Sequence, residues 1–145
     1  MVTKNNILTI SGAIVFKDYR ARRKFLVVKV KDEEGWEFPK VTVRRGESSV
    51  RAAIRMTGEQ AGMNARVLEE AGRFSGTAQI NGKSIPQKHL YYIMLQKSGG
   101  EIMGFEKFLW LEYDKALKAL TSKKEKEMLK NTKAVLKEWE KTHEV

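Results

Sequence analysis

The stretch from Trp36 to Met63 constrains the fold more than any other part of the chain. Its sequence is WEFPKVTVRRGESSVRAAIRMTGEQAGM. Pro39 lacks a backbone donor and favours extended structure before it. Ser48 or Ser49 can cap a following helix, and Gly62 is suited to end that helix in a left-handed conformation. The stretch therefore predicts extended chain, then a turn, then one helix.

The helix in this stretch has apolar or small residues at helical spacing, which predicts an inward face. Gly58 lies in its middle and costs about 1 kcal/mol relative to alanine. The residues predicted to face inward are Val50, Ala53, Ile54, Thr57 and Ala61.

The rest of the chain predicts strands around this helix and two helices near the end. Asn81-Gly82 is a strong hairpin signal. No repeat or linker divides the sequence, so residues 1–145 predict one α+β domain with helices packed on a mixed sheet. The predicted strands are Ile7–Phe16, Phe25–Val30, one or two within Arg66–Ile80, His89–Gln96 and Phe105–Leu111, and the predicted helices are Asp114–Leu120 and one from a Ser122 cap to about Thr142.

Composition narrows the function classes. The chain has no cysteine, which excludes disulfides, thiol catalysis and zinc–thiolate sites. No apolar run is long enough for a transmembrane helix, and the start of the chain lacks the apolar stretch of a signal peptide, so a cytoplasmic protein without a membrane partner is expected.

The net charge is +10, which favours polyanionic partners such as nucleotides or RNA; the alternative is a solvated basic surface. Arginine can contact phosphate with two parallel hydrogen bonds, so the arginine group is the better phosphate candidate. The lysine-rich end, interleaved with Glu125, Glu127, Glu138 and Glu140, is typical of a solvated helix face. The arginines in question are Arg20, Arg22, Arg23, Arg44, Arg45, Arg51 and Arg55.

The helix also carries three positions on which metal chemistry would depend. Residues at i, i+3 and i+4 share one helix face, and three carboxylates there can hold magnesium against phosphate oxygens. In this chain the three positions are Met56, Glu59 and Gln60. A thioether is a poor ligand for a hard cation, and an amide brings no charge.

The spacing of the whole stretch resembles the Nudix box: Gly, five residues, Glu, seven residues, Arg-Glu, an apolar residue, any residue, Glu-Glu, any residue, Gly, an apolar residue. The chain is similar to the dinucleoside-tetraphosphate hydrolase branch, because SGAIVF, WEFPK, KHLYYIML and FLWLEYDKALKAL resemble its other segments. The box positions fall without a gap on Val41, Glu47, Arg55, Met56, Thr57, Glu59, Gln60, Gly62 and Met63.

The resemblance implies a Nudix-like α/β/α sandwich with a mixed sheet, a box helix and a long C-terminal helix. It implies Glu59, Glu47 and Arg55 as catalytic residues, with Arg55 orienting Glu47. It implies Mg²⁺, or Mn²⁺, at Glu59, Glu47 and Gln60. Two carboxylates of the helix are replaced, so metal binding is expected to be weakened.

Two further departures concern the backbone and a fourth ligand. Val41 replaces the first glycine of the box, so a positive φ is not expected there. An acidic residue of the family falls at Gly104, and Glu106 is its nearest substitute.

Substrate contacts are predicted at five residues. The basic residues among them can contact phosphates; the alternative is that they are only solvated charges at the surface. Tyr91 and Tyr92 face opposite ways in a strand, so one lines the cleft, and the resemblance favours Tyr92. His89 is expected at the surface. The predicted substrate-binding residues are Lys40, Arg44, Lys83, Lys88 and Tyr92.

Three hypotheses follow. The first is a hydrolase that acts on nucleoside or dinucleoside polyphosphates with magnesium, with weak or lost activity. The second is a catalytically inactive Nudix-fold module that binds RNA or a nucleotide polyphosphate. The third is a variant, engineered or natural, whose substitutions rebuild the helix for another purpose.

Overall fold

The protein folds around one six-stranded sheet of order β4-β5-β1-β2-β6, with β3 paired to β1. The structure, a computed structural model, describes residues 7–19, 22–30, 34–99 and 102–142. Arg20 lies outside the described residues. The elements are β1 (Leu8–Tyr19), β2 (Arg22–Lys29), β3 (Lys40–Thr42), α1 (Ser49–Glu59), β4 (Met63–Ile80), β5 (Lys83–Gly99), β6 (Lys107–Glu112), α2 (Tyr113–Ala119) and α3 (Lys123–Thr142).

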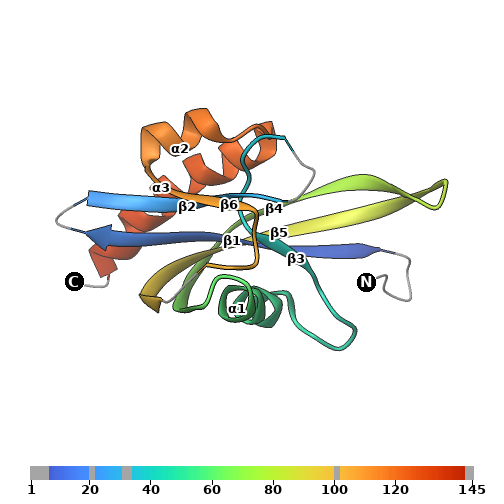
Figure 1. Cartoon of the computed structure of the whole chain (residues 1–145), viewed down its shortest axis with the longest axis horizontal. Coiled ribbons are helices and arrows are strands. Elements are labelled where there is room, and N and C mark those ends of the chain that lie inside the picture. Colours follow the sequence, from blue (N-terminus) through green and yellow to red (C-terminus); the bar gives the residue numbers. More distant parts are fainter. Residues whose placement is uncertain (1–6, 20–21, 31–33, 100–101, 143–145) are drawn as a thin grey trace.

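The sheet is mixed, as the sequence predicted. β1 runs parallel to β5, while the other strand pairs are antiparallel. β4 and β5 form a long hairpin that projects beyond the sheet (Figure 1). Its turn has φ of 52° at Asn81 and 77° at Gly82, which confirms the hairpin signal.

Helices cover both faces of the sheet: α1 lies on one side, and α2 and α3 lie on the other (Figure 1). Alternation along β1 divides its side chains between two cores. Ala13 and Val15 join the α1 core, whereas Ile14 and Phe16 join the α2–α3 core. This is the expected α/β/α sandwich. No described helix has the length and apolar content needed to cross a bilayer.

Four strands, β1, β2, β4 and β5, are longer than the sequence predicted, whereas β6 is one residue shorter and begins at Lys107 and not at Phe105. β1 and β2 extend into the expected charged turn Lys17–Lys24, because Lys17 pairs with Lys24 and Asp18 with Arg23 across the hairpin. Arg66–Ile80 lies in one strand, not two. Register shifts between Asn64 and Ala65, between Val67 and Glu69 and between Glu70 and Gly72 let β4 bend without ending.

The inward face of α1 differs from the prediction. Ile54 is 48% exposed, whereas Met56 is fully buried. The buried residues Ala52, Ala53 and Met56 show that the face of α1 in contact with the sheet is rotated from the predicted face. Methionine is unbranched and adaptable, so it fills the space between α1 and the sheet. Position 56 therefore belongs to the core.

The ends of α1 agree with the sequence. The Ser48 side chain accepts a hydrogen bond of 3.2 Å from the Arg51 N–H, so Ser48 is the N-cap. Gly62 has φ of 58°, the left-handed conformation expected after the helix. Val41 does not have a positive φ, which confirms that its backbone conformation suits a β-branched residue.

Candidate functional site

The turn between β3 and α1 is closed by a clamp between Arg55 and Glu47. Arg55 Nε donates to Glu47 Oε2 at 2.8 Å, and Arg55 Nη2 donates to Glu47 Oε1 at 3.0 Å. The Arg44 N–H donates to the same Oε1 at 3.0 Å. These hydrogen bonds, foremost those from Arg55, lower the pKa of Glu47 to about 2. The contact predicted between Arg55 and Glu47 is therefore present, and Glu47 stays ionised.

Magnesium, implied by the resemblance, needs several oxygen ligands at one place. The donors here do not fit it, because Met56 is buried in the core and Glu47 is held by Arg55. Glu59 is exposed at the end of α1, next to the uncharged Gln60. Within residues 7–19, 22–30, 34–99 and 102–142, no three His, Cys, Asp or Glu residues converge as a metal site.

The segment before β6 closes over the end of α1. The Gly104 N–H donates to the Gln60 carbonyl at 2.8 Å. A Cβ at Gly104 would lie 2.5 Å from Gln60 Cβ and 2.8 Å from Gln60 Cα, closer than side chains tolerate. An acidic ligand at position 104 would therefore require this segment to move. Glu106, the nearest substitute, is exposed, and its N–H donates to the Lys29 carbonyl.

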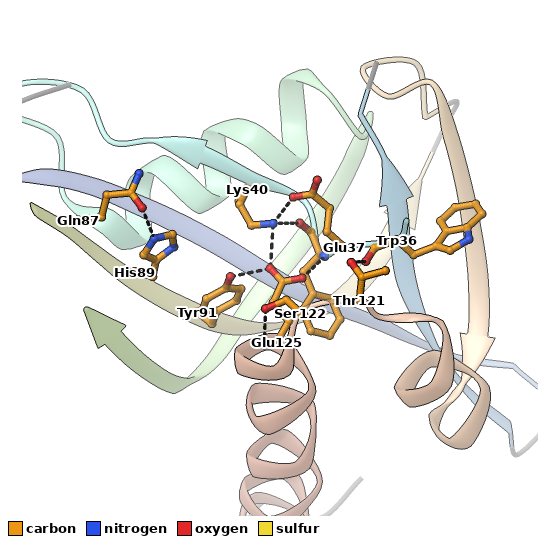
Figure 2. A network of polar contacts seen from close by, with 10 residues as sticks. Trp36, Glu37, Lys40, Gln87, His89, Tyr91, Thr121, Ser122 and Glu125 are labelled. Atoms are coloured by element: carbon orange, nitrogen blue, oxygen red, sulfur yellow. Dashed lines mark hydrogen bonds and ion pairs between the residues drawn. The ribbon is translucent and has the colours of Figure 1, made fainter. Parts of the chain in front are cut away.

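A second polar cluster lies on the opposite side of the sheet, around Glu125 at the start of α3 (Figure 2). Glu125 is only 2% exposed. Its Oε1 accepts from the Phe38 N–H at 3.0 Å, and its Oε2 accepts from the Tyr91 hydroxyl at 2.6 Å. Lys40 Nζ lies 2.8 Å from the same Oε2 and also pairs with Glu37. One carboxylate thus joins β5, α3 and the chain before β3.

An aromatic stack borders this cluster. Phe74 lies parallel to His89 at a centroid distance of 4.5 Å, and it also stacks with Tyr91 at 5.9 Å. Burial, followed by the positive charge of Lys40, lowers the pKa of His89, so the ring is neutral at pH 7. His89 Nε2 lies 2.9 Å from Gln87 Oε1, and it donates to this oxygen in the tautomer with the proton on Nε2.

In that tautomer His89 Nδ1 is an acceptor. It is buried, and it has no hydrogen-bond partner in the part of the chain that the structure describes. Buried polar atoms are nearly always satisfied, so an unpaired one at a cavity points to a missing donor. The adjoining cavity has a volume of about 390 Å³ and is lined by Glu34, Gly35, Glu37, Lys40, Phe74, His89, Tyr91, Thr121, Ser122 and Glu125.

The charge of this cavity is acidic on balance. Its lining contains three glutamates and one lysine, and that lysine is already paired with Glu37 and Glu125. A phosphate would have to compete with two carboxylates for Lys40. The cavity suits hydrogen-bond donors such as amino groups better than it suits phosphates.

The five predicted substrate residues are spread over the molecule. Lys40 lies at the Glu125 cavity, whereas Arg44 lies in the turn before α1. Lys83 is exposed at the hairpin tip, and Lys88, by strand alternation, faces away from His89. Tyr92 lies under α1, where its hydroxyl bonds Ser49, while Tyr91 lines the cavity. Their predicted roles remain predictions.

Glu125 is the site residue that the sequence reasoning misplaced, since it is buried and does not belong to a solvated face. A signal for it was present. It precedes Leu129, Thr132 and Leu136 by four, seven and eleven residues, which places it on the buried face of α3. Ser122, whose Oγ accepts from the Glu125 N–H at 3.2 Å, caps the helix as predicted.

Comparison with solved structures supports this architecture. An Ap4A hydrolase binary complex from C. elegans matches with a TM-score of 0.75 at 20% identity, over 90% of this chain and 98% of that chain. The NUDIX domain of Shewanella oneidensis NrtR, complexed with ADP ribose, matches at 0.70 and 13%, over 89% and 88%. The E. coli dihydroneopterin triphosphate pyrophosphohydrolase matches at 0.68 and 12%, over 90% and 96%. At these identities the likeness is one of fold.

Comparison with the sequences of curated proteins gave no match. The family model of the NUDIX domain matches residues 9–132, which span β1 to the middle of α3 and include the box helix. The match to the family model therefore covers most of the chain, and the chain belongs to the Nudix family.

Proposed function

We propose that this protein binds a nucleotide and does not hydrolyse it by a metal-dependent reaction. The observation that carries the proposal is at the box helix. Met56, which stands where the box has a carboxylate, is completely buried, and the Gly104 segment covers the backbone of Gln60. Position 56 of the metal-binding face has thus become packing surface, whereas Glu59 stays exposed.

The cavity at Glu125 supports binding of the base of a nucleotide, and not of its phosphates. It offers an unpaired acceptor at His89 Nδ1, carboxylate oxygens at Glu37 and Glu125, and an aromatic wall at Phe74. A nucleobase with an exocyclic amino group satisfies such acceptors and lies against aromatic walls. A volume of about 390 Å³ falls in the range of small-molecule sites. Structural neighbours are an Ap4A hydrolase and a domain complexed with ADP ribose, so these are the first ligands to test.

Isothermal titration calorimetry with ADP-ribose, Ap4A and ATP tests the proposal, once in EDTA and once with Mg²⁺. We expect binding that is unchanged by Mg²⁺, together with no nucleotide release. His89→Phe keeps the aromatic stack and removes Nδ1, so it should weaken binding about five- to tenfold, as loss of one hydrogen bond predicts.

The control is Glu59→Gln, which removes the remaining carboxylate of the helix triad. It should leave both binding and the absence of turnover unchanged. Magnesium-dependent release of nucleotide by the wild type, lost in Glu59→Gln, would instead establish the hydrolase hypothesis. If none of the three ligands binds, the nucleotide assignment fails.

A further inference from the structure

A second concave surface lies beside α1, separate from the Glu125 cavity. It has a volume of about 710 Å³ and is lined by Arg44, Arg45, Gly46, Glu47, Arg51, Ile54 and Arg55. We call it the arginine hollow. It shares no lining residue with the Glu125 cavity. Four of its seven residues are arginines, and one is acidic.

Three of these arginines are free to bind an anionic ligand. Arg44, Arg45 and Arg51 are exposed, and none of them forms an ion pair with another described residue. Glu47, the acidic residue of the hollow, is already bound by Arg55. Other arginines of the chain are engaged differently: Arg22 pairs with Glu112, and Arg23 pairs with Asp18 and Glu140. Of the four described arginines without an ion pair, three therefore lie at this hollow, and the fourth, Arg66, lies on β4 outside its lining.

The turn that carries Arg44 and Arg45 is held in one shape, and Arg51 lies on the following helix, α1. The Glu47 carboxylate accepts from the Arg44 N–H, and the Glu47 N–H donates back to the Arg44 carbonyl at 3.0 Å. Gly46 takes a positive φ of 78°, which closes the turn. Arg55 fixes Glu47 from α1 and also donates to the Thr42 carbonyl. A ligand therefore meets a preformed surface, which lowers the entropy lost on binding.

The chemistry of the hollow fits phosphate diesters next to unpaired bases. Guanidinium groups form paired hydrogen bonds with phosphate oxygens. Ile54, 48% exposed at the hollow, offers an apolar contact for the face of a sugar or base. We propose that the arginine hollow binds the phosphate backbone of a single-stranded nucleic acid. This site does not depend on the nucleotide site at Glu125.

The test is fluorescence anisotropy with a labelled single-stranded 12-mer, as RNA and as DNA, over a range of salt concentrations. The variant is Arg44→Gln/Arg45→Gln/Arg51→Gln. The matched control is Lys118→Gln/Lys130→Gln/Lys137→Gln, which removes the same charge from exposed positions on α2 and α3. Melting temperatures of both variants should equal that of the wild type, because the substituted side chains are exposed.

The arginine variant should bind about tenfold or more weakly, and the lysine control less than about threefold. For a single strand, each phosphate contact adds about 0.7 to the magnitude of the slope of log binding constant against log salt concentration. Loss of three contacts should therefore lower the magnitude of this slope by about 2 in the arginine variant. Arg44→Lys/Arg45→Lys/Arg51→Lys keeps the charge and should fall between the wild type and the glutamine variant.

Binding of either RNA or DNA supports the proposal, and their ratio identifies the preferred sugar. Equal weakening by the two glutamine variants would show that net charge, not the hollow, drives binding, and would overturn the proposal. Equal affinity for a duplex of the same sequence would overturn the single-stranded assignment. Displacement by inorganic polyphosphate at equal phosphate concentration would overturn the nucleic-acid assignment, and so would a wild type that does not bind.

Discussion

Met56 occupies a position where the box has a metal-binding carboxylate, and here that position is part of the core. Its side chain is fully buried among residues of the α1 core, such as Val15 and Met94. Met56→Glu would bury a carboxylate without partners, and we expect it to destabilise the fold by about 3 kcal/mol or more. Met56→Leu conserves volume and should cost less than about 1.5 kcal/mol. Urea denaturation measures both. Equal stability of Met56→Glu and the wild type would show that position 56 reaches solvent.

The Arg55–Glu47 clamp predicts a dependence of stability on pH. The pKa of Glu47 falls from an ordinary 4.5 to about 2 in the folded protein. A lowered pKa stabilises the fold above pH 4.5, and this contribution is lost as the pH falls from 4.5 towards 2. Glu47→Gln should therefore flatten the fall in melting temperature between pH 5 and 3, compared with the wild type. Parallel melting curves over that interval would contradict this effect.

The network at Glu125 ties three parts of the chain, so Tyr91 should contribute to stability as well as to the cavity. Tyr91→Phe removes the hydroxyl that donates to the buried carboxylate at 2.6 Å. We expect a loss of about 1.5–3 kcal/mol, the range for hydrogen bonds to charged groups. Tyr113→Phe is the control, because Tyr113 is partly exposed and packs at the edge of the same core. A loss no larger than that of the control would show that Glu125 is satisfied without Tyr91.

At the scale of elements, two glycines near the box helix should respond in opposite ways. A Cβ at Gly58 would meet nothing within 4 Å, so Gly58→Ala should stabilise the protein by about 1 kcal/mol. Gly104→Ala should destabilise it, because its Cβ would lie 2.8 Å from Gln60 Cα. Chemical denaturation distinguishes the two signs. A neutral Gly104→Ala would mean that the segment before β6 does not pack closely on α1.

Local signals in the sequence predicted the elements better than their burial. The caps at Ser48 and Ser122, the end at Gly62 and the turn at Asn81 depend on neighbouring residues alone, and the structure confirms them. The burial of an individual side chain depends on distant elements. Ile54 is apolar, as an inward residue would be, but α1 packs on the sheet through the face that carries Met56, and Ile54 stays exposed.

At the scale of the whole molecule, the sheet separates two candidate sites. The arginine hollow adjoins α1, and the Glu125 cavity adjoins α3. These two helices cover opposite faces of the sheet (Figure 1). The resemblance to the family predicted the fold, and the family model matches residues 9–132. It did not predict the second cavity, because Glu125 meets Phe38 and Tyr91 only through contacts 87 and 34 residues apart.

The same long-range packing predicts that the lost carboxylates alone will not restore a hydrolase. Met56→Glu/Gln60→Glu supplies the box charges, but position 56 lies in the α1 core and the Gly104 segment still covers the end of the helix. We therefore expect no calorimetric Mg²⁺ binding and no release of nucleotide from Ap4A or ATP. Gln60→Glu alone, at a partly exposed position, is the folded control in both assays. Gain of magnesium-dependent turnover in the double variant would show that the segment before β6 opens, and that only two side chains separate this protein from a hydrolase.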